Sequence, residues 1–439
     1  MKKKYRIILY TSIFLLCVVA SIILVVKKSN SVYEEESKPK VVKHKSMLSM
    51  NLEQTAGSGD YKTVTQSSWP TEGYKFNAEL SKCENGSTLS WDDTKKAVIM
   101  QGNVSDKCYV YFDIWIPSIA DYCTSGTDLA TCVKNFGDQG PSVSNIYIHN
   151  SSLTNGAGDN SYRYAGANPN NFVCFGSDAS PCPIDNLYRI IGVFGENYHG
   201  ANGKQLVKLI KYDYMTTDEL GTDGDYSQTY KEWGMDSTYK GTYGDGERIG
   251  VYYWNYKATG SATNTWSTSL LNKTNLNTNF INNIGTTWAN KIATVTWKVG
   301  GNTWANIGTK TSSVAYTNEI TNPVTTNTTD NATTYSAKIG LMYVSDYGFA
   351  ASPDAWTLTM SSYNNTTATN NNWMYMGLYE WTISRNAGHS NLAFFVYNDG
   401  LLDNYNVSSD LGVRASFNLE SSVSYVSGSG SMSDPIVIN

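Results

Sequence analysis

The longest apolar run in the chain lies near its start. Residues 7–26, IILYTSIFLLCVVASIILVV, carry no charged side chain. A helix of this length measures roughly 30 Å, the thickness of the hydrocarbon core of a bilayer. Four basic residues lie among the first six positions, and Lys27 and Lys28 follow the run, so the positive-inside rule places the rest of the chain outside the cell. We therefore predict a cytoplasmic stub and an uncleaved transmembrane signal-anchor over residues 1–28, with a single-pass membrane protein and an extracellular ectodomain as the consequence. A cleaved signal peptide is the alternative, although the run is long for one and no A-x-A-like site follows it.

The pattern changes twice in the next ninety or so positions. Residues 29–72 are polar and have no clear period, so they cannot bury enough apolar surface to become ordered, and we predict a flexible stalk. From residue 73 onward, alternating and apolar segments at 74–80, 97–100 and 108–112 are separated by turn residues. Short strands at this spacing predict a small β-sandwich-like module over residues 73–116.

The remaining chain combines many short apolar runs with one helical pattern. Residues 117–144 form a connecting segment, and residues 145–439 form the largest predicted domain. Its strand candidates are 172–175, 187–194, 206–210, 338–344, 373–376, 381–385, 393–396, 413–417 and 435–438.

The helical pattern covers residues 267–284, where apolar side chains recur near a spacing of 3.6: Leu270, Leu276, Phe280 and Ile284. A second short helix is predicted at 288–293. Many strands with one or two helices define an α+β domain. Long loops join its elements, among them SYRYAGANPNN at residues 161–171.

Composition indicates an exported protein rather than a nucleic-acid-binding one. Of 439 residues, 16% are charged and 13% are aromatic, with 32 Tyr and 12 Trp, whereas an average soluble domain has about 25% charged residues. The net charge is −5 and no basic stripe is present, which argues against a nucleic-acid partner.

The cysteines indicate an oxidising compartment. One of the seven, Cys17, lies in the apolar run, and an even number outside it favours disulfides. Zinc is the alternative, but structural zinc sites usually bring two ligands together over two to four intervening residues, and no such spacing occurs. We predict three local disulfides between neighbours in the sequence: Cys83 with Cys108, Cys123 with Cys132, and Cys174 with Cys182.

Catalytic and metal-binding motifs are weak. No G-x-S-x-G, H-E-x-x-H or Walker A pattern is present. His389, in the small-residue loop 385–391, is the best single candidate for a functional histidine and is counted among the candidate ligand-binding residues; a solvated loop histidine is the alternative. The acidic stretch 213–247 places no two carboxylates on one rigid element. Asp223 and Asp225 suggest calcium as an alternative to a solvated turn, although the complete D-x-D-x-D-G loop is missing.

Two arginines follow apolar residues near the ends of predicted strands. We expect Arg385 and Arg414 to have a structural role, either in an ion pair or as clamps on backbone carbonyls. Direct contact with a ligand is the alternative.

Aromatic residues carry the strongest indication of binding, because Tyr and Trp present flat apolar faces with polar tips. Four of them lie in a Gly/Asp-rich loop with few apolar neighbours, and we predict an exposed ligand-binding patch there: Tyr230, Trp233, Tyr239 and Tyr243. A second group contains Trp373, Tyr375, Tyr379 and Trp381. Other tryptophans are expected in the core, namely Trp266 and Trp297, together with Trp381.

Five short motifs lie along the large domain: YRIIGV (188–193), NTWSTSLLN (264–272), IGLMYVS (339–345), WTISR (381–385) and GVRASFNL (412–419). Their order resembles an uncharacterised bacterial surface-protein family, and more distantly the formylglycine-generating-enzyme branch of the C-type-lectin-like fold. The whole chain also resembles membrane-anchored surface proteins of low-GC gut Gram-positive bacteria. The resemblance implies a C-type-lectin-like domain with long loops. Two departures limit it: Ala415 replaces the usual Pro, and the last cysteine is Cys182, so the family's catalytic cysteines are absent and the oxidase chemistry does not carry over.

These patterns favour binding over catalysis. We expect a surface-anchored adhesion protein that recognises an extracellular glycan or protein through loop aromatics, with no catalytic residue assigned and no cofactor other than the calcium alternative. A cell-envelope hydrolase acting on cell-wall polymer or protein, with its site near His389, is the first alternative. A structural surface-layer or appendage subunit is the second.

Overall fold

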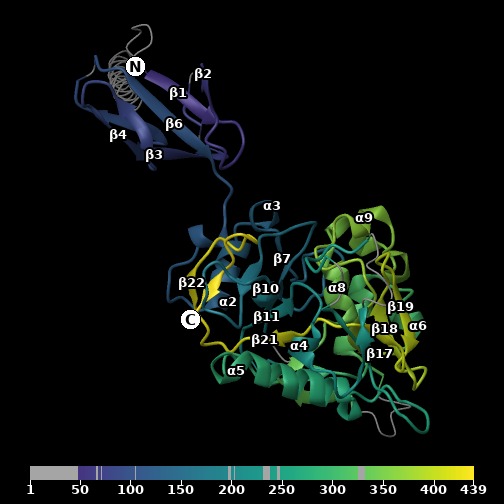
Figure 1. Cartoon of the computed structure of the whole chain (residues 1–439). Coiled ribbons are helices and arrows are strands. Elements are labelled where there is room, and N and C mark those ends of the chain that lie inside the picture. Colours follow the sequence, from purple (N-terminus) through teal and green to yellow (C-terminus); the bar gives the residue numbers. More distant parts are fainter. Residues whose placement is uncertain are drawn as a thin grey trace, which may run out of the picture. The chain divides into compact units, whose positions relative to one another are not determined.

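The computed structural model describes residues 48–439 except 66–67, 71, 104, 196–198, 202, 231–237, 245–247 and 325–331. The chain divides into two compact units, one ending at Ile116 and one covering Pro117–Asn439 (Figure 1). The division falls where the predicted β module ends, and the predicted connecting segment belongs to the second unit.

The fold class predicted with a transmembrane helix requires correction. The part of the chain that the structure describes is mixed α/β, with several sheets and mostly short helices. No helix in that part is long and apolar enough to cross a bilayer. The apolar run at residues 7–26 lies outside the described residues.

The first unit consists of a four-stranded sheet and a separate hairpin. In spatial order the sheet contains β2 (Tyr61–Val64), β1 (Leu48–Glu53), β6 (Cys108–Ile114) and β3 (Tyr74–Cys83), and the hairpin joins β4 (Thr88–Asp92) to β5 (Ala97–Gln101). The stalk prediction is therefore wrong from residue 48 onward. Strand β1 runs parallel to β6, with Met50 opposite Val110 and Leu52 opposite Phe112, so two apolar side chains of a short strand become ordered against a partner distant in sequence.

The second unit contains two large sheets. The seven-stranded sheet follows the order β16 (Ile339–Gly340), β21 (Ser416–Asn418), β11 (Leu206–Lys211), β10 (Leu187–Phe194), β8 (Tyr162–Tyr164) and β7 (Ile146–Ile148), with β9 (Phe172–Cys174) also paired to β10. The six-stranded sheet follows the order β12 (Tyr226–Thr229), β13 (Gly250–Tyr253), β20 (Asp410–Gly412), β17 (Glu380–Arg385), β18 (Leu392–Val396) and β19 (Leu402–Asn406).

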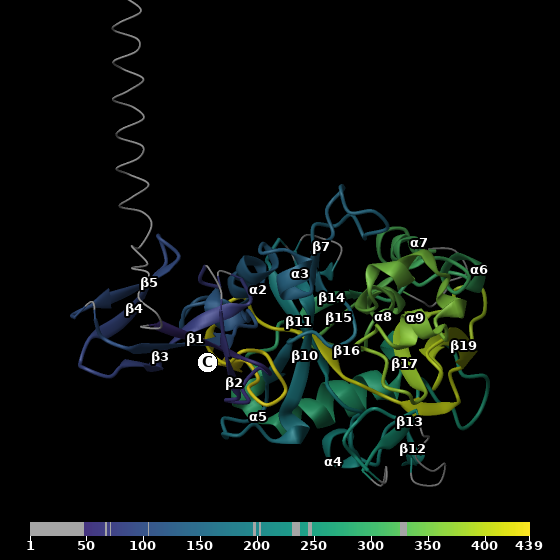
Figure 2. The same cartoon turned by 90° about the horizontal axis from the view of Figure 1, so that it is seen from above.

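Helices pack against these sheets: α2 (Leu129–Gly137) contacts strands β7, β8, β10 and β11 of the seven-stranded sheet. Helix α2 and strand β19 lie at opposite ends of the unit in both views (Figure 2). Two shorter helices, α8 (Val344–Ala350) and α9 (Thr366–Thr369), lie near the six-stranded sheet. The predicted helix at 267–284 is present but shifted: it begins with the π-helix η6 (Leu271–Phe280) and continues as α5 (Ile281–Ala289).

The shift explains which residues of the predicted apolar stripe are buried. Leu276 and Phe280 are buried as predicted, whereas Leu270 precedes η6 and is 42% exposed. Gly285 has a φ of 77° and interrupts helical geometry within α5. A side chain is disfavoured at that φ, so glycine suits the break between the two predicted helices.

Strand predictions succeed where β-branched and other apolar residues fill a buried strand. Strand β10 matches the predicted range, and β11, β17 and β18 differ from theirs by one residue at an end. Two predictions are wrong: residues 373–376 contain no strand, and the run at 338–344 contributes only β16 before α8 begins. A short apolar run does not by itself distinguish a buried strand from a buried turn or helix start.

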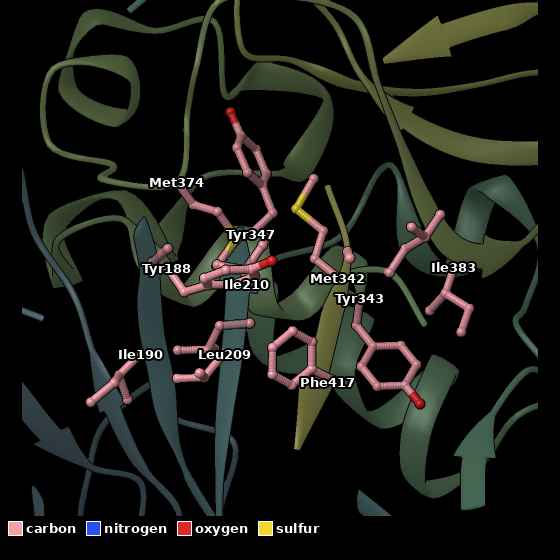
Figure 3. Close-up of a cluster of buried hydrophobic side chains, with 14 of the residues drawn as sticks. Tyr188, Ile190, Leu209, Ile210, Met342, Tyr343, Tyr347, Met374, Ile383 and Phe417 are labelled. Carbon is pink, nitrogen blue, oxygen red and sulfur yellow. The ribbon is translucent and has the colours of Figure 1, made fainter. Parts of the chain in front are cut away.

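The core of the second unit contains side chains from both large sheets and from the helices that pack on them. Figure 3 shows side chains from adjacent strands in this core, among them Ile190, Leu209 and Phe417. The predicted core positions of Trp266, Trp297 and Trp381 are confirmed, because each is at most 2% exposed.

The three predicted disulfides are present: Cys83–Cys108, Cys123–Cys132 and Cys174–Cys182. The first joins β3 to β6, and the third ties the end of β9 to the segment before β10. Among the described residues, one group of three potential metal ligands was found, Asp106 with Cys83 and Cys108. Both of those sulfurs are engaged in the disulfide, so the group does not offer a thiolate site.

Candidate functional site

The predicted aromatic patch is not an exposed surface. Tyr230 and Tyr243 are each 6% exposed and pack into a small core with Tyr214, Ile249 and other apolar residues. Their predicted exposure is therefore wrong, because apolar partners come from distant segments. Trp233 lies outside the described residues.

Tyr239, the fourth member of the patch, is half-buried and stabilises the loop to which it belongs. Its hydroxyl donates to the carboxylate of Asp213 at 2.6 Å, and the backbone N–H of Thr242 donates to the same carboxylate at 2.6 Å. Burial and the adjacent Asp213 charge raise the pKa of the Tyr239 phenol. The side chain thus stabilises the loop rather than facing a ligand.

His389 lies on an exposed loop. Asn264 fixes this loop by donating its side-chain amide to three backbone carbonyls, including that of His389 at 2.9 Å. Within the described ranges, the imidazole makes no hydrogen bond to a carboxylate or a hydroxyl. The arrangement expected of a hydrolase is not assembled around His389 there.

The two carboxylates that suggested a calcium site already accept hydrogen bonds from the protein. Asp225 accepts hydrogen bonds from the backbone N–H groups of Leu270 and Leu271, both at 2.8 Å, and from Tyr256 at 3.0 Å. It therefore caps the start of the long helix. Asp223 accepts the side-chain amide of Asn279 at 2.6 Å.

The structural role predicted for the two arginines is confirmed. Arg414 forms a buried, two-pronged ion pair with Glu380, at 2.8 and 2.9 Å. Arg385 donates to the backbone carbonyl of Val299 at 3.0 Å. Arg414 thus acts through an ion pair, and Arg385 acts as a clamp on a backbone carbonyl.

A cavity of about 270 Å³ lies elsewhere on the second unit, where loops from distant parts of the chain meet. We call it the loop pocket. Its lining residues are Ala167, Asn168, Asn170, Phe172, Arg189, Tyr212, Lys240, Thr369, Asn370, Asn372, Trp373, Tyr375, Met376 and Met432.

Long-range backbone pairing builds the loop pocket. Gly166 and Asn372 form a parallel β-bridge, and the N–H of Trp373 donates to the Gly166 carbonyl at 2.9 Å. The N–H of Phe172 donates to the carbonyl of Gly430 at 2.8 Å. These bonds bring three segments, separated by more than 200 positions at their extremes, to one place.

The segment that carries Lys240 docks through a glycine. A Cβ at Gly377 would lie 1.8 Å from the Thr238 carbonyl oxygen, and Gly377 has a φ of 81°. Only glycine permits this approach. The backbone N–H of Lys240 then donates to the Met376 carbonyl at 2.9 Å, which fixes the segment against the pocket.

Arg189 lies between two aromatic rings at the inner side of the loop pocket. Its guanidinium carbon is 4.4 Å from the centre of the Phe172 ring and 4.6 Å from that of Trp373. It donates to the side chain of Asn171 at 2.7 Å and to two backbone carbonyls. Arg189 therefore fixes the positions of both rings.

Three amides on the loops remain available. The side chains of Asn168, Asn170 and Asn370 line the pocket. None of these side chains forms a hydrogen bond with another residue that the structure describes. An amide offers two donors and an acceptor. By contrast, the side-chain amide of Asn372 already has a hydrogen-bond partner, because it donates to the Tyr347 carbonyl at 3.0 Å.

A buried network of ionisable residues was not predicted from the sequence. Asp159 pairs with Arg163 at 2.8 Å and with His199 at 3.0 Å, and Lys208 pairs with Asp346. All five are less than 10% exposed. Charged residues inside apolar strands, such as Lys208 in LVKLIK, were the available signal. Their mutual pairing indicates a structural network.

Comparisons with protein-family models, with curated proteins and with solved structures give no match for this chain. The resemblance to a surface-protein family and to the formylglycine-generating-enzyme-like fold therefore stays a prediction.

Proposed function

We propose that the second unit is a glycan-binding module in which one or two sugar units enter the loop pocket. The observation that carries the proposal is the combination of buried aromatic rings with three unengaged amides in one cavity. Small-molecule sites are mostly apolar clefts with a few placed polar groups. Sugars match this pattern, because their hydroxyls need donors and acceptors and their apolar ring faces pack on aromatic rings, such as that of the partly exposed Tyr212 in the pocket lining.

Size favours a glycan over a protein partner. Stable protein interfaces bury about 800 Å² on each side, whereas a cavity of about 270 Å³ is slightly below the roughly 300–1,000 Å³ of drug-sized ligand sites. The pocket thus fits a small ring better than a protein surface.

The disulfides support a location outside the cytosol for this function. Three disulfides are present, and such bonds persist in secreted and surface proteins but are rare in the reducing cytosol. Glycans of cell walls and cell surfaces occur in the same compartment. Within the described ranges, we find no comparable observation in favour of the hydrolase or the structural-subunit alternative.

A glycan array probed with the full chain, its disulfides intact, tests the proposal. We expect the double variant Asn168→Ala/Asn370→Ala to bind its best glycan about 5- to 150-fold more weakly, because each lost hydrogen bond contributes roughly 0.5–1.5 kcal/mol. Asn135→Ala is the matched control, since Asn135 is an exposed asparagine of α2 that does not line the pocket. Equal binding by the double variant and the wild type would refute the proposed site.

A further inference from the structure

The charges around the loop pocket are all of one sign. Its lining contains two cationic residues, Arg189 and Lys240, and no acidic side chain of the described chain is among the lining residues. A neutral sugar does not require an excess of positive charge around its site. The positive lining therefore favours a ligand that carries negative charge.

The charge of Arg189 is not compensated by any acidic group that the structure describes. Its hydrogen bonds go to an amide and to backbone carbonyls, and burial lowers its pKa to about 9. Arg414 shows the usual arrangement, because Glu380 neutralises it in the same interior. An unpaired buried cation is costly, and an anion in the adjacent cavity would offset that cost.

Lys240 supplies the accessible part of the positive charge. Its side chain is exposed, its ammonium lies 4.3 Å from the centre of the Tyr375 ring, and it donates to the Thr369 carbonyl at 3.2 Å. Partial desolvation lowers its pKa. One carbonyl leaves two of the three ammonium donors unused, so Lys240 is able to contact an anion directly.

We infer that the sugar bound in the loop pocket carries a carboxylate, as uronic and sialic acids do; this inference rests on the proposed function. Lys240 contacts the carboxylate. Arg189, whose N–H groups are engaged with carbonyls and Asn171, attracts the carboxylate through its charge and keeps Phe172 and Trp373 in place. The hydroxyls of the sugar bind the amides of Asn168, Asn170 and Asn370.

Calorimetric titration of the full chain with glucuronic acid and with glucose tests the inference, because the two differ only in a carboxylate at one carbon. We expect glucuronic acid to bind at least about tenfold more tightly, with the preference falling as salt screens the charges. Lys240→Met should remove most of the preference and Lys240→Arg should keep it. Lys273→Met is the matched control, since Lys273 is exposed on η6 and does not line the pocket.

The possible failures are distinguishable. Equal affinity for glucose and glucuronic acid would overturn the inference and leave the glycan-binding function intact. Binding of neither sugar, together with an empty glycan array, would overturn both. Inorganic phosphate binding as tightly as glucuronic acid would show a simple anion site and would also overturn the inference.

Discussion

Glu319 is a buried carboxylic acid whose hydrogen-bond partners, among the residues that the structure describes, are neutral. It is 1% exposed, and it accepts hydrogen bonds from the N–H of Ser345 at 2.7 Å and from the Ser384 hydroxyl. Burial raises its pKa from 4.5 to about 7. The folded state therefore holds the proton more tightly than the unfolded state does.

This shift predicts the sign of a pH effect on stability. Because the pKa of Glu319 is raised on folding, its contribution to stability is full below about pH 4.5 and is lost as the pH rises toward 7. Glu319→Gln should remove that loss, so the variant should gain up to about 3 kcal/mol relative to wild type between pH 4 and pH 8. Urea unfolding of both proteins at the two pH values measures the gain. Parallel pH dependences in the two proteins would contradict the account.

The side chains of the loop pocket show what sequence could and could not predict. Trp373 and Tyr375 were predicted as an aromatic group and 161–171 as a loop. Their proximity could not be predicted, because it depends on backbone pairings such as Gly166 with Asn372. The predicted binding patch contained Tyr230 and Tyr243 instead, whose burial depends on equally distant partners.

Among the elements, the long helix illustrates how one buried carboxylate sets a boundary. The capping residue Asp225 is distant in sequence and belongs to the turn before β12, so the local pattern placed the helix start several residues early. Strands such as β10 were predictable because their buried apolar residues are contiguous and need no partner to be recognised.

Asp225→Ala should lower the free energy of unfolding by about 2–3 kcal/mol, since capping contributes roughly 1 kcal/mol and unsatisfied buried N–H groups add to the loss. Thermal and chemical unfolding measure this value. We expect the same loss with and without added calcium, because the oxygens of Asp225 accept three backbone N–H groups. Asp218→Ala, at an exposed residue of the neighbouring α4 (Thr217–Leu220), is the control. A stabilisation by calcium that only Asp225→Ala abolishes would instead identify a metal ligand.

Across the second unit, the two disulfides have different relations to the loop pocket. Cys174–Cys182 ends strand β9, which carries Phe172 and pairs with β10 opposite Arg189. Cys123–Cys132 ties α2 to the segment before it, and neither residue lines the pocket. Oxidation should therefore support ligand binding through one bond and overall stability through both.

Paired serine variants separate the two effects. Loops of eight or nine residues predict a loss of about 2–3 kcal/mol of stability for either pair. We expect Cys174→Ser/Cys182→Ser also to weaken glycan binding, whereas Cys123→Ser/Cys132→Ser should retain it at temperatures where both variants are folded. Denaturant unfolding and glycan titration measure the two quantities. Equal loss of binding in both variants would show that the effect is global.

The central claim is that a sugar occupies the loop pocket, and a crystal structure of the full chain grown with glucuronic acid tests it most directly. The account predicts density for the sugar in the loop pocket against Tyr212, with its carboxylate beside the Lys240 ammonium and its hydroxyls within hydrogen-bond distance of Asn168 or Asn370. Density for the sugar at another place on the molecule, with the loop pocket filled only by water, would contradict it.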